Sequence, residues 1–181
     1  MQLRKAIHIS GVLIPYLAGS DILGKEFTLS LAVSGLVVYL AVEFHKPRIS
    51  REIRALVYRE NEMEGFSIEP LLYIISIISL LSLSFFIYEK ICFAAIAVLA
   101  AGDGFAGVMG RRFGKHRLPF NKNKSWEGSM SGFIAAAAAG FYYAGPIAIV
   151  GSLFGMIAGA VNRHDNIAVP YAALISMFLV Q

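Results

Sequence analysis

The chain has 181 residues, of which 57% are apolar and 15% charged, whereas soluble domains carry roughly 25% charged residues. This composition, with a mean hydropathy of +0.65, predicts an integral membrane protein, and the length predicts a single domain over residues 1–181. The net charge of +4 is compatible with nucleic-acid binding, but basic residues in membrane proteins more often report topology, so no nucleic-acid partner is expected.

Seven apolar runs follow one another along the chain, and they cover residues 6–19, 27–44, 70–88, 91–109, 130–144, 146–161 and 167–180. They predict helices, because isolated strands are excluded in lipid and no alternating pattern indicates a barrel. The first run follows a basic start as in a signal peptide, but His8 and Pro15 interrupt it, so we expect it to remain as the first helix. The predicted fold is therefore an all-α polytopic bundle of about seven transmembrane helices. Because several runs are shorter than ~20 residues, five or six crossings also fit.

Lysine and arginine are distributed very unevenly if these runs cross a bilayer in alternation. Fourteen of the sixteen then lie on one face, in the N-terminus and at residues 45–69, 110–129 and 162–166, and the other face has only Lys25 and Lys90. Cytoplasmic loops are enriched in basic residues. This face is therefore predicted to be cytoplasmic, with the N-terminus inside.

Most of the unusual polar residues fall at the same predicted face, so we expect them to converge on one site at the membrane surface. Asp103 is the most informative, because an unpaired ionisable residue inside an apolar span is costly and therefore indicates function. The alternative for Asp103 is a structural ion pair with a nearby arginine. The other members are Arg4, Lys5, His8, Glu43, His45, His164, Asp165 and Asn166.

Glycines surround Asp103. Residues 102–107, GDGFAG, match the G-x-G-x-x-G pattern of dinucleotide-binding folds, but that motif requires a preceding strand in a βαβ unit, which is not predicted here. Two other uses remain open, namely close approach of the backbone to a phosphate and close packing against another helix. The glycines concerned are Gly102, Gly104, Gly107 and Gly110.

The segment at residues 110–129 carries six lysines and arginines, more than topology alone requires. It contains no Walker A sequence, which excludes a soluble P-loop NTPase. Basic residues beside glycines, with Ser125 and Glu127 at the entry to the next helix, provide what a polyphosphate with magnesium needs. A positive-inside loop and attraction to anionic lipid headgroups are the competing interpretations.

Five short motifs run in order along essentially the whole chain. They are R-K-x-x-H at residues 4–8, G-D-x-x-A at residues 102–106, Gly110, K-S-x-E-G-S at residues 124–129, and D-N-x-x-x-P at residues 165–170. Each is weak alone, but together they resemble the CTP-dependent polyprenol kinase family, which includes dolichol kinases, phytol kinases and CTP-dependent diacylglycerol kinases. The resemblance implies transfer of the γ-phosphate of a nucleotide, typically CTP, to the hydroxyl group of a membrane lipid alcohol, with Mg²⁺ or another divalent cation.

The resemblance also implies roles for individual residues, since phosphoryl transfer requires mainly an in-line approach and neutralised phosphates. Asp103 is expected to be a metal ligand or the base for the lipid hydroxyl, and Lys124 to bind phosphate. Glu127 is expected to be a second metal ligand or to organise the loop, and Asp165 with Asn166 to complete metal or nucleotide binding. The predicted catalytic residues are Asp103, Lys124, Glu127 and Asp165. Nucleotide and phosphate binding is assigned to Arg4, Lys5, His8, Gly102, Gly104, Gly107, Gly110, Lys115, Ser125 and Asn166.

Two other activities are alternatives to a kinase. A lipid cytidylyltransferase also brings CTP and a lipid together, but the P-G-H-G-G-x-x-D-R-x-D signature typical of such enzymes is absent. A transporter would have polar residues near the midplane and access from both faces, whereas the outer ends are nearly featureless here. The acceptor stays open between an isoprenoid alcohol of the dolichol, phytol or geranylgeraniol type and a diacyl- or dialkylglycerol. A multi-pass protein of the cell membrane is expected, and a homodimer is compatible with the sequence.

Overall fold

The computed structural model describes residues 3–46 and 65–181, and within them the side chains of residues 3 and 4 lie outside the description. Eight helices and no strand occur in these ranges, so the all-α prediction is confirmed for the described part of the chain. The helices are α1 (Leu3–Ser10), α2 (Leu13–Ala18), α3 (Gly24–His45), α5 (Ile68–Leu83), α6 (Glu89–Phe113), α7 (Trp126–Ala144), α8 (Ile147–Val161) and α9 (Asp165–Leu179).

The helices coincide with the seven predicted apolar runs except that the first run is divided into α1 and α2. Pro15 explains the division, because proline lacks the N–H that would bond to the carbonyl of Gly11 and its ring clashes with that carbonyl. Ile14 donates to the Gly11 carbonyl instead, at 3.1 Å, and the chain turns at this point. The interruption that Pro15 predicted is therefore a change of direction within the first hydrophobic segment.

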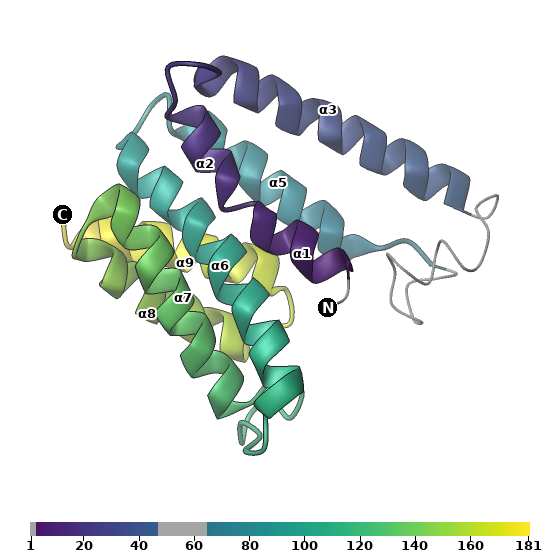
Figure 1. Ribbon diagram of the computed structural model, residues 1–181, viewed down its shortest axis with the longest axis vertical. Coiled ribbons are helices and arrows are strands. Elements are labelled where there is room, and N and C mark those ends of the chain that lie inside the picture. The colour runs from purple at the N-terminus through teal and green to yellow at the C-terminus, as the bar shows by residue number, and fades with distance from the viewer. Residues whose placement is uncertain (1–2, 47–64) are drawn as a thin grey trace.

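Helix α6 is the centre of the bundle and contacts α1, α2, α5, α7, α8 and α9 (Figure 1). Every side chain from Ile91 to Ala101 is buried. Helix α7 approaches α6 through small residues, since a Cβ at Gly132 would lie 2.7 Å from the carbonyl oxygen of Gly102 and one at Gly128 would lie 2.8 Å from the Gly110 Cα. The backbones are therefore as close as in small-residue interfaces of membrane bundles.

Two helices in the described ranges are long and apolar enough to cross a membrane, but they differ in their surroundings. Helix α6 has a hydropathy of 2.0 with 72% of its apolar window buried, whereas α3 has a hydropathy of 1.9 with 11% buried. Helix α3 lies along one side of the bundle, next to α2 and α5 (Figure 1). The number of membrane crossings stays a prediction, because α5, α8 and α9 are shorter apolar helices.

Candidate active site

Asp103 lies on α6 at the centre of a partly buried polar cluster formed with α1. The Nζ atom of Lys5 lies 2.8 Å from Asp103 Oδ2 and 3.3 Å from the Asp103 carbonyl oxygen. His8 Nε2 lies 3.3 Å from the same Oδ2. Lys5 and His8 reach one carboxylate because residues three apart share a helix face. The predicted convergence of the first two motifs is therefore present, and the partners of Asp103 are a lysine and a histidine rather than an arginine.

Two glycines of α6 allow α1 to come close enough for these contacts. A Cβ at Gly107 would lie 2.6 Å from Lys5 Cε and 2.7 Å from Lys5 Nζ, and one at Gly104 would collide with Ile9. Gly110 faces α7 instead, where a Cβ would lie 3.3 Å from Ser125 Oγ. The glycines around Asp103 thus allow close helix packing, which is one of the two uses predicted for them. The other use, close approach of the backbone to a phosphate, remains a prediction.

A second ion pair joins the loop after α6 to the start of α9. Lys124 Nζ lies 2.9 Å from Asp165 Oδ2 and donates to the carbonyl oxygen of Gly159 at 2.5 Å. Asn121 fixes the same loop against α8, since its Nδ2 donates to the Ala160 carbonyl oxygen at 2.9 Å. The K-S-x-E-G-S and D-N-x-x-x-P motifs therefore meet.

The two ion pairs act on each other electrostatically. Asp165 precedes the predicted span at residues 167–180. Burial is the main cause that raises the pKa of its carboxyl, the negative charge of Asp103 raises it further, and Lys124 opposes both. The two lysine–carboxylate pairs, which come from different segments, are therefore close enough for their charges to influence each other.

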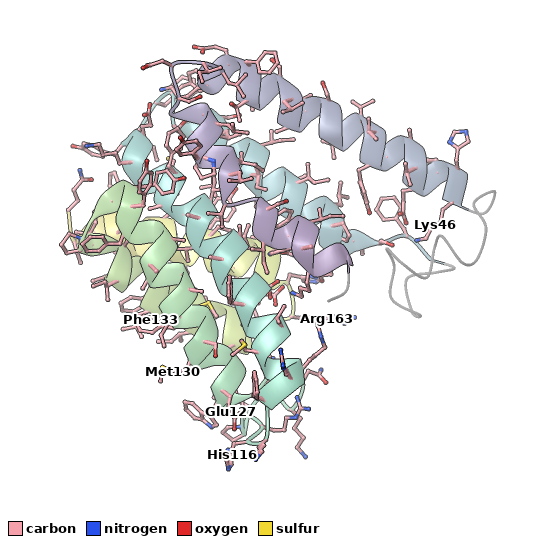
Figure 2. The ribbon with its side chains drawn as sticks, viewed as in Figure 1. Lys46, His116, Glu127, Met130, Phe133 and Arg163 are labelled. Atoms are coloured by element: carbon pink, nitrogen blue, oxygen red, sulfur yellow. The ribbon has the colours of Figure 1, made fainter. Side chains whose placement is uncertain are left out.

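The carboxylate of Glu127 contacts His116 and not the lysines of this cluster. It lies with His116 at the outer tip of the α6–α7 connection (Figure 2), where Glu127 Oε1 is 2.6 Å from His116 Nδ1. Hydrogen bonds from its own backbone N–H and from His116 lower the pKa of Glu127 to about 2. These contacts agree with the loop-organising role. Its role as a metal ligand stays a prediction, and the described residues contain no group of three His, Cys, Asp or Glu side chains that could hold a metal.

The remaining predicted residues divide between the cluster and its surroundings. Ser125 caps α7, because its Oγ accepts a hydrogen bond from the Gly128 N–H at 3.2 Å. Lys115 is exposed on the loop. The side chain of Arg4 lies outside the described residues. The predicted convergence was wrong for Glu43, which forms a separate buried pair with Lys46 at 2.8 Å.

His45 was also wrongly placed in the predicted convergence. It is exposed at the end of α3, where its Nδ1 lies 2.8 Å from the Ala41 carbonyl oxygen. A residue at the predicted cytoplasmic end of a helix therefore need not face the bundle interior.

The sequence profile of the cytidylyltransferase family matches residues 6–180. The chain belongs to this family. No solved structure matches the chain significantly.

The similar curated proteins are plant isoprenoid alcohol kinases. The probable phytol kinase 1, chloroplastic, of Oryza sativa subsp. japonica is 32% identical over 145 residues, which cover 68% of this chain and 46% of that protein. Phytol kinase 1, chloroplastic, of Arabidopsis thaliana is 31% identical over 144 residues, 68% of this chain and 47% of its own length. Farnesol kinase, chloroplastic, of Arabidopsis thaliana is 32% identical over 130 residues, 61% of this chain and 42% of its own length. The chain thus matches less than half of each relative, and the predicted resemblance to the CTP-dependent polyprenol kinase family is confirmed.

Two residues that support the polar cluster around Asp103 and Asp165 were not predicted from the sequence. Tyr73 on α5 donates to the carbonyl oxygen of His8 at 2.8 Å, and its ring lies 4.1 Å from the imidazole. A tyrosine in an apolar run carries no signal of this role. Glu69, at the start of α5, binds His164 and Asn166. Its place at the predicted cytoplasmic end of a span could have identified it.

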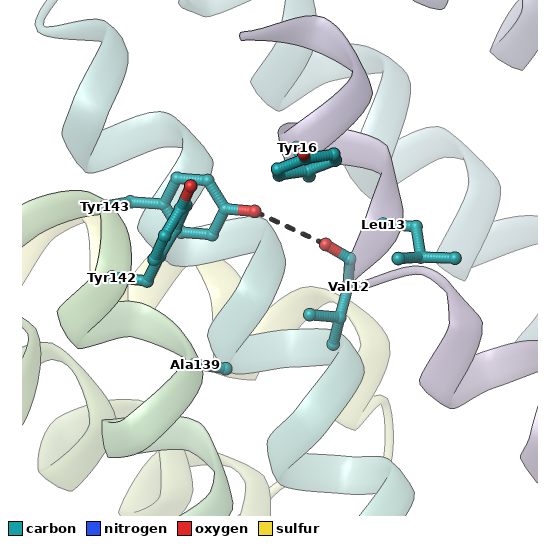
Figure 3. Close-up of a pocket in the computed structure, with 6 residues that line it drawn as sticks. All are labelled: Val12, Leu13, Tyr16, Ala139, Tyr142 and Tyr143. Atoms are coloured by element: carbon teal, nitrogen blue, oxygen red, sulfur yellow. Dashed lines mark hydrogen bonds between the residues drawn. The ribbon is translucent and has the colours of Figure 1, made fainter. Parts of the chain in front are cut away.

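The described residues also form a small apolar pocket between α2 and α7, apart from the polar cluster. Its volume is about 270 Å³, and it is lined by apolar and tyrosine side chains only (Figure 3). Tyr143 closes one side with a 3.5 Å hydrogen bond to the carbonyl oxygen of Val12. The side chains that line the pocket carry no charge, in contrast to the cluster around Asp103.

Proposed function

We propose that this protein is a membrane-embedded kinase that transfers the γ-phosphate of CTP to the hydroxyl group of an isoprenoid alcohol of the phytol or farnesol type. The observation that carries the proposal is the pair of lysine–aspartate contacts, Lys5 with Asp103 and Lys124 with Asp165, which bring together four segments distant in sequence. The names of the similar kinases support the acceptor class.

The cluster contains the groups that phosphoryl transfer needs. Lys5 and Lys124 neutralise phosphate oxygens, while Asp103 accepts the proton of the lipid hydroxyl as its oxygen attacks the γ-phosphorus and CDP leaves. His8, beside the same carboxylate oxygen, holds Asp103 in position. The reaction then yields a lipid monophosphate and CDP.

The donor groups also fit a magnesium ion carried by the nucleotide. Mg²⁺ is commonly held by one or two carboxylates together with substrate phosphates, and Asp165 is the partly buried carboxylate beside the phosphate-binding Lys124. Asp165 would hold the ion, which would neutralise negative charge on the phosphates. Asp103 is left to the acceptor hydroxyl.

A membrane setting supports the same arrangement. Helix α3 exposes a largely apolar surface, which lipid chains would cover. The two ion pairs involve the second half of α6 and the basic segment at residues 110–129 that follows it. An isoprenoid alcohol keeps its hydroxyl group at the headgroup level while the nucleotide arrives from the aqueous side. We propose a multi-pass protein of the cell membrane whose site opens on the cytoplasmic face.

A lipid cytidylyltransferase is the second candidate, because the matching family carries that description. The two reactions are distinguished by which phosphate reaches the lipid. The purified protein is incubated with Mg²⁺, with CTP labelled at either the α- or the γ-phosphate, and with phytol, farnesol, geranylgeraniol, dolichol or diacylglycerol. A kinase transfers only the γ label, whereas transfer of the α label would establish a cytidylyltransferase. Competition with unlabelled ATP, GTP and UTP then tests the choice of CTP as donor.

A further inference from the structure

Glu69, in the first turn of α5, holds both sides of the turn that presents Asp165. Its Oε1 lies 3.0 Å from Nδ1 of His164, and its Oε2 accepts a hydrogen bond from Nδ2 of Asn166 at 3.0 Å. The same Nδ2 donates to the Glu69 carbonyl oxygen at 3.1 Å. One residue of α5 therefore binds the two neighbours of Asp165.

Asn166 has a second attachment to α5. Pro170 has no N–H, so it cannot donate to the carbonyl of Asn166 four residues earlier. Ser76 donates its hydroxyl to that carbonyl oxygen at 2.7 Å, and Asn166 is only 5% exposed. Asn166 is thus fixed through its side chain by Glu69 and through its backbone by Ser76.

These contacts restrict the position of Asp165, which lies between the two residues that Glu69 binds and itself pairs with Lys124. We infer that Glu69 is a positioning residue for nucleotide binding, which acts by holding the 164–166 turn so that Asp165 and Lys124 meet the phosphates together. This inference rests on the proposed function. It assigns Glu69 no contact with substrate.

A purely structural role is the competing explanation, because an acidic residue in the first turn stabilises any helix through its dipole. Glu89 provides the matched control. It is also a glutamate in the first turn of an apolar helix, and it pairs with Lys25 at 2.6 Å. A dipole effect predicts similar behaviour of Glu69 and Glu89, whereas positioning predicts a kinetic effect at Glu69 alone.

The test compares Glu69→Ala, Glu69→Gln and Glu89→Ala in the full chain. Loss of residues that orient metal or phosphate ligands typically costs about 10–100-fold in affinity or activity, so Glu69→Ala should raise the KM for CTP by about tenfold or more. The KM for the lipid alcohol should stay unchanged. Glu69→Gln keeps an acceptor for Asn166 and a partner for His164, so it should restore most of the affinity.

A double-variant cycle with Asn166→Ala tests the route of the effect. If Glu69 acts through the turn, Glu69→Ala should have much less effect in the Asn166→Ala background, because coupled residues are not additive. Binding of CTP with Mg²⁺, measured by thermal shift, provides a readout that needs no acceptor.

Several outcomes would overturn the assignment. They are an unchanged CTP affinity in Glu69→Ala, an equal rise in both KM values, additive effects in the cycle, or no recovery in Glu69→Gln. If the wild-type protein binds and uses CTP while Glu69→Ala behaves normally, only the Glu69 inference fails. A wild-type protein that neither binds CTP nor phosphorylates any acceptor would contradict the proposed function and this inference together.

Discussion

The two ends of the bundle each carry a lysine paired with a carboxylate, but the pairs have different surroundings. At one end Lys25 lies 2.6 Å from Glu89, with side chains 26% and 44% exposed, and its Nζ is 4.8 Å from the centre of the Phe85 ring. At the other end Lys5 lies 2.8 Å from Asp103, with side chains 9% and 15% exposed. An exposed pair contributes little and costs little, whereas a buried pair pays a large desolvation cost that its attraction repays only in good geometry.

The difference in exposure and neighbours separates a surface contact from the pair to which the proposed function is assigned. The Lys25 pair can be explained as a surface contact that fixes the start of α6 beside α3. The Lys5 pair has a further neighbour, His8, and a second lysine–aspartate pair feels its charge. An apolar packing of the same volume would serve stability equally well. The proposed chemistry would explain why these charges are present. Burial alone does not single them out, because the Glu43–Lys46 pair is buried more deeply.

Among the substitutions that test this comparison, Asp103→Asn should have the largest effect on activity. The amide keeps the shape of the side chain but cannot accept the proton of the acceptor hydroxyl, so γ-phosphate transfer should fall by at least about 100-fold. Glu89→Gln, at the other end, should leave the rate within about twofold, since an exposed ion pair contributes little. Both rates are measured with saturating CTP and alcohol, and size-exclusion profiles establish that the variants are folded. Substantial transfer by Asp103→Asn would remove Asp103 from the reaction.

Lys5→Met and Lys25→Met form the next matched pair. Loss of a charge-assisted contact costs about 1.5–3 kcal/mol, so Lys5→Met should raise the KM for CTP by about tenfold or more. Lys25→Met should leave that KM unchanged. Thermal unfolding should also separate them, because Lys5→Met leaves Asp103 partly buried without its lysine. Equal effects of the two substitutions on the KM would mean that the comparison between the ends is wrong.

Gly107→Ala tests whether the close approach of α1 is needed for function. The added Cβ would lie 2.6 Å from Lys5 Cε, and the flexible lysine must move away from Asp103. Activity should fall several-fold while the melting temperature changes little. Gly35→Ala on α3 is the control, since its Cβ would meet nothing within 4 Å, and alanine favours a helix by about 0.5–1 kcal/mol over glycine. Gly35→Ala should keep full activity. Unchanged activity in Gly107→Ala would mean that the close packing of α1 against α6 is not needed for function.

The positions of the helices could be predicted because a long apolar run in lipid can satisfy its backbone hydrogen bonds in few structures other than a helix. The contact of Lys5 and His8 with Asp103 could also be anticipated, since topology puts the N-terminus and the end of α6 on one face. That reasoning places residues at one end of a bundle, but it does not say which way each side chain points. Glu43 shows the limit, because it is buried with Lys46 rather than directed at Asp103.

The supporting contacts could not be predicted from the sequence. Tyr73 and Ser76 lie in an apolar run, where the simplest expectation for any side chain is that it packs in the core. Their roles depend on the carbonyl groups of α1 and α9 to which they donate hydrogen bonds. The freed carbonyl of Asn166 follows from Pro170, but its partner follows only from how α5 and α9 cross. Motifs therefore identified the two lysine–aspartate pairs, but they did not identify Glu69, and tertiary packing determined which neighbours hold the pairs in place.

Glu127→Gln should have the smallest effect and decides between the two roles predicted for Glu127. The lowered pKa, about 2, lies below the usual value, so Glu127 stays ionised at every pH where the enzyme is assayed, and its contribution to stability is lost only as the pH falls toward 2. Glutamine keeps an acceptor for His116, so a loop organiser predicts less than about fivefold loss of activity and an unchanged dependence on Mg²⁺ concentration.

A metal ligand predicts instead that Glu127→Gln weakens Mg²⁺ by about 10–100-fold, which activity measured against Mg²⁺ concentration would detect. The half-buried position of Glu127 at the tip of the loop, paired with the exposed His116 (Figure 2), favours the first outcome. Asp165→Asn provides the positive control, because Asp165 is the carboxylate next to Lys124. If both substitutions shifted the Mg²⁺ dependence equally, the loop would have to fold over the cluster when the nucleotide binds.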